Sequence, residues 1–320
     1  MSVTEVGSIA IVVDQKCNIK CDHCCFSSGP KSAEHLSDDE ILAIVQNAAT
    51  DPDIHTVGFS GGEALLRRDL IIKCLMILSA AGMTSSVTTN GYWGQTAKKA
   101  EKEARELKKA GLSVLTVSYD SFHAAYMPAI RIRNILDACR TIHLRCRLNV
   151  AITKKLGAAP IIESLGDSIV GVPVSIFPTE PVGRAEKIGA EELIRKETDP
   201  AALRCPGFEP TFHFDHKIYP CCSPAVFSTC LSIGKVGDES VSKAVRYIEH
   251  NAYFAIIRKE GFGWLYNTAV QMNLIPEQKE GFVDVCELCH ILTSNEQIFK
   301  ALAPKIIGHY RELCNTEKAA

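Results

Sequence analysis

Short apolar blocks alternate with longer segments of helical periodicity over the first half of the chain. The short blocks are rich in branched residues and predict strands at 7–13, 54–60, 84–89, 113–118, 144–152 and 172–177. The segments between them predict helices at 37–49, 66–81, 95–110, 129–140 and 158–166. Strands and helices that alternate at this interval indicate a parallel sheet with right-handed crossovers.

The alternating pattern stops too early for a complete barrel. A closed (β/α)8 barrel needs about 250 residues, whereas here the rhythm breaks near Pro178, where Pro181 and Gly183 follow. We therefore expect an α/β fold in which residues 1–190 form a partial (β/α)6 barrel of TIM type. Such a barrel leaves one side open for a large substrate.

The second half of the chain has a different pattern and many cysteines. It predicts a hairpin from Thr211 to Phe214 and from Lys217 to Tyr219, then helices near 238–261, 264–273 and 295–313. We expect residues 191–320 to form a separate C-terminal domain. No internal repeat or low-complexity tract is found.

Composition and charge narrow the function classes. The chain has 320 residues, 46% of them hydrophobic, and a net charge of −2 that gives no general field for nucleic acid. No apolar run is long enough to span a membrane, and no secretion signal begins the sequence, so a cytoplasmic protein is expected. Fourteen cysteines in a reducing compartment indicate metal binding rather than disulfides.

Three cysteines follow the first predicted strand as C-x3-C-x2-C: Cys17, Cys21 and Cys24. Three thiolates leave one iron of a [4Fe–4S] cluster open to a small molecule. A zinc knuckle is the alternative, although zinc sites usually close with four ligands.

The triplet and its position resemble the radical S-adenosylmethionine (radical SAM) superfamily. The resemblance implies that SAM chelates the open iron, and that Gly61-Gly62-Glu63, after the second strand, binds the SAM amino group. His23 occupies the position whose ring packs near the adenine, with an ordinary loop histidine as the alternative.

Further polar residues follow the later strands. Ser118 and Asp120 end the fourth strand, Asn149 lies on the fifth, and Arg184 follows the sixth; Asn90 follows the third. If the register is right they face the barrel mouth, and the resemblance implies contacts with the SAM ribose, its carboxylate or a peptide. Capped turns and satisfied polar groups are the alternative.

A second cysteine set consists of Cys205, Cys221, Cys286 and Cys289. It resembles the auxiliary-cluster segment of the SPASM and twitch branches of radical SAM enzymes, which implies a second [4Fe–4S] cluster. We expect the Cys286-x2-Cys289 pair on a loop. A zinc ribbon is the alternative, and whether Cys230 is a further ligand stays open.

Cys222 directly follows one of these cysteines. Neighbouring side chains on extended backbone point to opposite faces, so Cys221 and Cys222 should not bind the same cluster. Tyr219-Pro220-Cys221-Cys222-Ser223-Pro224, Cys205-Pro206-Gly207 and Cys286-Glu287-Leu288-Cys289 resemble radical SAM peptide epimerases, and further similar motifs cover nearly the whole chain. The resemblance implies that Cys222 donates a hydrogen atom to a peptide Cα. The alternative is that Cys222 only fills space as a small buried apolar side chain.

The expected function is therefore conversion of L- to D-residues in a ribosomally synthesised precursor peptide. The expected cofactors are two [4Fe–4S] clusters and SAM, with a flavodoxin- or ferredoxin-type reductant. The alternatives are a radical SAM maturase that forms thioether or carbon crosslinks, and a non-enzymatic metal-binding scaffold. The first strand begins near residue 7, so we expect no leader-binding domain before it. The peptide would then be held by the barrel rim and the C-terminal segment.

Overall fold

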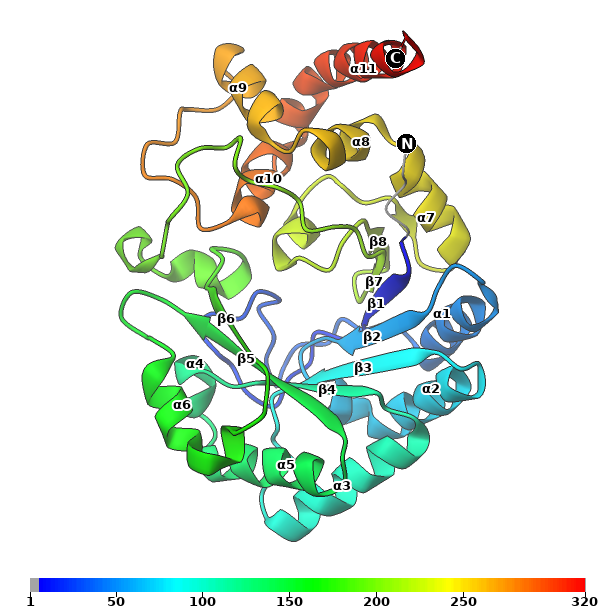
Figure 1. Cartoon of the computed structure of the whole chain (residues 1–320), viewed down its shortest axis with the longest axis vertical. Coiled ribbons are helices and arrows are strands. Elements are labelled where there is room, and N and C mark those ends of the chain that lie inside the picture. The colour runs from blue at the N-terminus through cyan, green and yellow to red at the C-terminus, as the bar shows by residue number, and fades with distance from the viewer. Residues whose placement is uncertain (1–5, 320) are drawn as a thin grey trace.

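Six parallel strands form a curved sheet in the computed structural model, which describes residues 6–319 (Figure 1). Strands β1 to β6 span Ser8–Val12, Thr56–Ser60, Thr84–Thr89, Val114–Ser118, Arg145–Ile152 and Val174–Pro178. Each pairs in parallel with the next along the chain. The α/β partial barrel predicted from the sequence is therefore confirmed.

The helices between these strands pack on the outside of the sheet, except the four-residue helix after β4, whose His123 lines the interior of the barrel. They are α1 Asp38–Thr50, α2 Arg68–Ala80, α3 Ala97–Ala110, α4 Ser121–Ala124, α5 Ala129–Thr141 and α6 Ala159–Leu165. Ser37 starts α1 with a capping box, in which its side chain accepts from the Glu40 N–H and Glu40 accepts from the Ser37 N–H. The predicted helix 66–81 begins instead with a 3₁₀ turn, η1 Ala64–Arg67.

The C-terminal strands continue the barrel sheet. Strands β7 Thr211–His213, β8 Lys217–Tyr219 and β9 Gly234–Lys235 extend it in the order β6-β5-β4-β3-β2-β1-β7-β8-β9. The predicted hairpin is confirmed as the antiparallel pair β7 and β8. β1 lies between β2 and β7 and pairs in parallel with both. A division into domains 1–190 and 191–320 stays a prediction, and this sheet crosses it.

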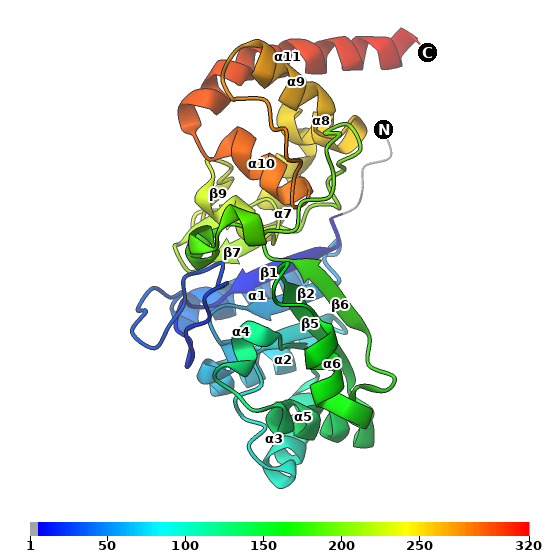
Figure 2. The ribbon, with the colours of Figure 1, turned by 90° about the vertical axis from the view of Figure 1, so that its left-hand side faces the viewer.

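The remaining helices gather beyond β7, at the opposite end of the molecule from α3 and α5 (Figure 2). They are α7 Val241–His250, α8 Ala252–Lys259, α9 Gly263–Gln271, α10 Val285–Thr293 and α11 Glu296–Ala319. Short 3₁₀ turns are η2 Gly166–Ile169, η3 Gly183–Lys187, η4 Ala190–Glu192 and η5 Pro224–Ser228.

Two expectations for the C-terminal half are wrong. The helix predicted at 238–261 is two helices, because the Asn251 side chain leaves the helical pattern and caps α8 by accepting from the Tyr253 and Phe254 N–H groups. The pair Cys286 and Cys289 lies on helix α10 rather than on a loop. The Asp284 side chain begins that helix by accepting from the Cys286 and Glu287 N–H groups.

The core is continuous across barrel and C-terminal elements. Ile9 and Ile11 on β1, Phe212 on β7 and Ile218 on β8 are all buried within it. This burial explains why β1 is a continuous apolar run. Among the described residues, no helix combines the length and apolar character needed to cross a bilayer.

Candidate active site

The loop after β1 carries the first cysteine triplet. Cys17 and Cys21 are buried and Cys24 is half-buried, and the three pack with Ile19 and Met127 in a small apolar cluster of their own. The Cys24 N–H donates to the Cys21 carbonyl at 3.2 Å, and the Ser28 N–H donates to the Cys24 Sγ at 3.3 Å. The loop thus turns all three sulfur atoms toward one region.

The three thiols line a cavity of about 460 Å³ at the carboxyl ends of the barrel strands. Burial raises the pKa of Cys17 to about 11 and raises that of Cys21 still further. Metal binding at these cysteines must therefore displace protons. Three convergent sulfur donors beside open space fit an iron–sulfur cluster with a free coordination position.

Gly61 and Gly62 line the same cavity and pack against the cysteine loop. A Cβ on Gly62 would lie 2.2 Å from the Lys16 carbonyl oxygen, and Gly61 has a φ of +149°. The Gly62 N–H donates to the Asp14 carbonyl at 2.8 Å. Glycine is needed here because the turn supports the cysteine loop at very close range.

Glu63 lies behind the cavity wall rather than in it. Its carboxylate accepts from the Leu65 N–H at 3.2 Å, the Thr89 hydroxyl at 2.8 Å and the Asn90 N–H at 2.7 Å. Burial raises the pKa of Glu63 to about 7, while these hydrogen bonds oppose the rise. Glu63 joins the ends of β2 and β3, and its contact with SAM stays a prediction.

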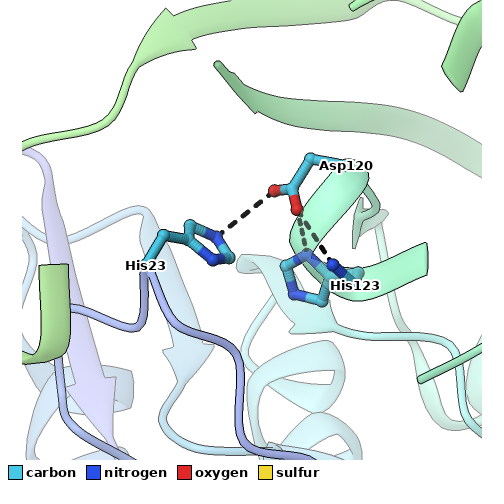
Figure 3. Close-up of side chains that lie close together, drawn as sticks. All are labelled: His23, Asp120 and His123. Atoms are coloured by element: carbon cyan, nitrogen blue, oxygen red, sulfur yellow. Dashed lines mark hydrogen bonds and ion pairs between the residues drawn. The ribbon is translucent and has the colours of Figure 1, made fainter. Parts of the chain in front are cut away.

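His23, Asp120 and His123 form a hydrogen-bonded trio on the cavity wall (Figure 3). Asp120 accepts from His123 Nδ1 at 2.9 Å and pairs with His23 Nε2 at 3.3 Å. Burial alone would raise the pKa of Asp120, but the two histidines hold it well below its usual range. His23 stacks on Phe122 with 4.3 Å between ring centroids.

This trio orients His23. The nitrogen and oxygen atoms of the three residues that could bind a metal ion lie within 4.8 Å of one another. The hydrogen bonds of both histidines to Asp120 already account for this arrangement. Asp120 also accepts from the Phe122 and His123 N–H groups at 3.0 and 3.1 Å. The carboxylate is thus committed to holding the two rings.

The other predicted contacts divide between the cavity and its support. Asn90, Ser118 and Asn149 line the cavity, and Asn90 Nδ2 also donates to Asn18 Oδ1 at 2.9 Å. Arg184 is not among the lining residues. Its guanidinium donates to the Cys21 and Ser28 carbonyls and so clamps the cysteine loop.

The second cysteine set comes together around helix α10. Cys205, Cys221, Cys286 and Cys289 line one small, mostly apolar cavity. Tyr253 closes it, with its hydroxyl 3.5 Å from the Cys289 Sγ. Burial raises the pKa of Cys289 to about 11 and also raises that of Cys221. The four thiols share this cavity, as the ligands of a bound cluster would, and Cys230 is not among the residues that line it.

Cys222 lines the barrel cavity with the first triplet, whereas Cys221 lines the second. Cys222 is exposed at the cavity wall, although protein surrounds it closely enough that burial raises its thiol pKa to about 12. The carboxylate of Glu209, which contacts the thiol, adds to the rise. Cys222 therefore stays a protonated thiol at neutral pH.

The cavity residues to which the sequence analysis gave no role include Cys25, Glu180 and Glu209. No motif spacing marks them, because the polypeptide reaches the cavity there from irregular segments. Burial and the nearby carboxyl of Asp284, which shares a hydrogen bond with it, raise the pKa of Glu180 to about 8. Since Asp284 caps α10, Glu180 links the barrel cavity to the second cysteine site.

Comparisons with known proteins indicate the family to which the chain is similar. Residues 11–153 match the family model described as "Radical SAM superfamily". A protein of Bacillus subtilis (strain 168), named "Putative peptide biosynthesis protein YydG", is 33% identical over 311 residues, covering 95% of this chain and 98% of that protein. A GTP 3',8-cyclase of Campylobacter jejuni is 30% identical over 173 residues, about half of either chain.

Among solved structures, Streptococcus suis SuiB bound to the precursor peptide SuiA has a similar fold. It is 15% identical, with a TM-score of 0.57, and the match covers 88% of this chain and 76% of SuiB. At this identity the similarity concerns the fold.

Proposed function

The chain belongs to the radical SAM superfamily, and from this premise we propose that it is a peptide epimerase that converts L-residues to D-residues. One observation carries the proposal: Cys222 lines the same cavity as Cys17, Cys21 and Cys24, while Cys221 lines the other cysteine site. A thiol in that position can deliver hydrogen to a substrate held in the cavity.

The proposal assigns Cys17, Cys21 and Cys24 as ligands of a [4Fe–4S] cluster that also binds SAM. When bound and reduced, these cofactors supply a 5′-deoxyadenosyl radical that abstracts hydrogen from a peptide Cα. His23, held by Asp120, would contact the adenine, and the polar residues Asn90, Ser118 and Asn149 would contact the rest of SAM or the peptide. Gly61, Gly62, Glu63 and Arg184 would fix the loop that carries the ligands.

Cys222 would then donate its S–H hydrogen atom to the opposite face of the planar Cα radical. The Cα–H bond forms as the S–H bond breaks, which leaves a thiyl radical on Cys222. One electron and one proton restore the thiol. The electron would come from a flavodoxin- or ferredoxin-type reductant, with a second [4Fe–4S] cluster on Cys205, Cys221, Cys286 and Cys289 as the nearby carrier.

Two similarities support a peptide substrate. The Bacillus subtilis relative is named for peptide biosynthesis, and SuiB, which shares the fold, has been solved with a precursor peptide bound. The substrate would be a ribosomally synthesised precursor peptide, processed in the cytoplasm.

Deuterium incorporation tests the reaction. The thiol hydrogen exchanges with solvent, so turnover in D2O should place one deuterium on each inverted Cα, with 5′-deoxyadenosine formed alongside. A product lighter by two hydrogens would identify a crosslinking maturase instead. Reduced protein that makes no 5′-deoxyadenosine from SAM would point to a non-enzymatic metal scaffold.

A further inference from the structure

Strand β6 lies at one edge of the sheet (Figure 2), and Phe177 and Pro178 at its C-terminal end line the barrel cavity. The Leu148 N–H donates to the Pro173 carbonyl at 2.9 Å, and the Thr179 N–H donates to the Ile152 carbonyl at 2.9 Å. Since backbone groups alternate in a parallel ladder, Ser175 and Phe177 also bond toward β5. Val174 and Ile176 therefore direct their N–H and carbonyl groups away from the sheet.

The stretch of this edge from Val174 to Phe177 carries no residue that blocks strand addition, and Pro178, which has no N–H, ends it. β6 reads Val-Ser-Ile-Phe-Pro and carries no charged side chain. Ile176 and Phe177 in the strand are 49% and 42% exposed, and Val170, shortly before it, is 67% exposed. Three large apolar side chains are thus accessible to solvent. An uncharged edge with exposed apolar residues is suited to pair with another chain.

The edge is continuous with the cavity. Phe177 and Pro178 line the same cavity as Cys222, and the Phe177 side chain lies on the face of the sheet that Asn149 and Ala151 share. An added strand would lie about 4.8 Å from β6. Its backbone would therefore run along the open side of the barrel, beside the part of the cavity wall that Phe177 forms.

We propose that β6 is the docking strand for the substrate peptide, which pairs with the free N–H and carbonyl groups of Val174 and Ile176 in an extended conformation. The identity of this occupant rests on the proposed function. The edge should favour a peptide segment whose backbone N–H groups are free. The peptide side chains that contact Ile176 and Phe177 should be uncharged. Main-chain pairing supplies affinity and the cavity supplies selectivity.

Ile176→Pro tests the pairing from the enzyme side. Proline removes the outward N–H but leaves the hydrogen bonds to β5 in place, and edge strands accept it. The probe is a synthetic copy of a precursor peptide chosen from the short reading frames near the gene for this chain. We expect about tenfold weaker binding or worse, from the lost hydrogen bond and the bulk of the ring. Ile176→Val, which keeps the N–H and an apolar side chain, should bind as wild type.

Binding is measured without reductant, so it is independent of turnover. Binding that depends on Ile176 while no D-residue forms would sink the proposed function and leave the docking strand standing. Equal affinity of Ile176→Pro and wild type, with unchanged thermal midpoint and iron content, would overturn the docking strand while epimerisation could still be observed.

A second measurement does not depend on the variant folding. Probe peptides with single amide-to-ester replacements should lose affinity at every second position over the paired stretch, because alternate N–H groups face β6. Hydrogen exchange should also slow at Val174 and Ile176 when the probe is added. Ester effects without this period would overturn the proposal. Protection of both amides before peptide is added, together with a dimeric mass, would identify a second copy of the chain as the occupant instead.

Discussion

Cys221 and Cys222 are consecutive in the chain, yet their side chains line two different cavities. The separation occurs just after β8, where the backbone bends at Pro220 and Cys221. Two consecutive residues therefore connect the second cysteine site to the barrel cavity. This arrangement would place a prospective hydrogen donor directly beside a prospective cluster ligand.

Replacing Cys222 with alanine should abolish D-residue formation while 5′-deoxyadenosine is still produced. The variant removes the hydrogen donor and leaves Cys17, Cys21 and Cys24 in place. Chiral amino acid analysis and chromatography of the nucleoside measure the two products. Cys25→Ala is the matched control because Cys25 lines the same cavity. Retained epimerisation in the Cys222 variant, or its loss in the Cys25 variant alone, would shift the donor role to Cys25.

Replacing Glu209 with glutamine should lower the pKa of the Cys222 thiol. Burial is the larger cause of its value of about 12, and the Glu209 carboxylate adds to it. Removing that charge favours the thiolate, so alkylation of Cys222 near pH 8 should speed up by about tenfold for each unit by which the pKa falls. Mass spectrometry of the Cys222 peptide measures the rate, with the exposed Glu34→Gln as control.

The raised pKa of the Cys222 thiol also affects the pH dependence of epimerisation. A thiol whose pKa is raised keeps its proton as pH rises through the ordinary cysteine range and loses it only near the raised value. Epimerisation in wild type should therefore not fall through Cys222 ionisation between about pH 7 and 9. In the Glu209→Gln variant the epimerisation rate should begin to fall at a lower pH than in wild type. Identical pH–rate profiles and identical alkylation rates in the two proteins would show that Glu209 does not act on the thiol.

Gly183→Ala should loosen the first cysteine loop. Gly183 has a φ of +61°, and a Cβ there would lie 2.1 Å from the Cys25 carbonyl oxygen. We expect about 1–3 kcal/mol of destabilisation from the backbone strain, with loss of iron from the reconstituted protein. Gly157→Ala, with nothing within 4 Å of the added Cβ, should be neutral. Thermal unfolding and iron analysis compare the two, and equal behaviour would contradict the role given to Gly183.

The double variant Cys286→Ala/Cys289→Ala should halve the iron content. Two [4Fe–4S] clusters give about eight irons per chain, and removing one leaves about four. The remaining cluster should keep the change in its paramagnetic resonance spectrum on addition of SAM, because Cys17, Cys21 and Cys24 are untouched. The triple variant of those three cysteines should lose that response and keep the other half of the iron. Unchanged iron in the double variant would exclude a cluster on α10.

Periodicity in the sequence was sufficient to predict the barrel. Its strands are short branched runs bounded by turn residues, and each predicted strand and the hairpin occur in the structure. Cys286 and Cys289 were placed on a loop because a nine-residue helix among C-terminal turns leaves little periodic signal. Asn251 reads as an ordinary helical position, and only its hydrogen bonds to the α8 N–H groups reveal the break.

The sequence predicted those residues of the cavity that belong to recognisable motifs, and it did not predict the others. The cysteine loop and Gly61-Gly62 come from recognisable spacings, and the structure brings them together with Cys222. The sequence could not indicate that the Glu63 carboxylate joins β2 to β3 and that Arg184 supports the cysteine loop from behind, because side-chain direction depends on long-range packing. Glu180 and Glu209 gave no local signal, since tertiary contacts alone bring them to the cavity wall.

The position of β1 between β2 and β7 also constrains how the chain matures. Ala10 pairs with Thr211, so a nascent polypeptide leaving the ribosome has one flank of its first strand uncovered until the whole barrel has been translated. The cysteine loop follows that strand directly. Insertion of iron at the first site is therefore expected late in biogenesis, after the C-terminal half has emerged and closed the sheet.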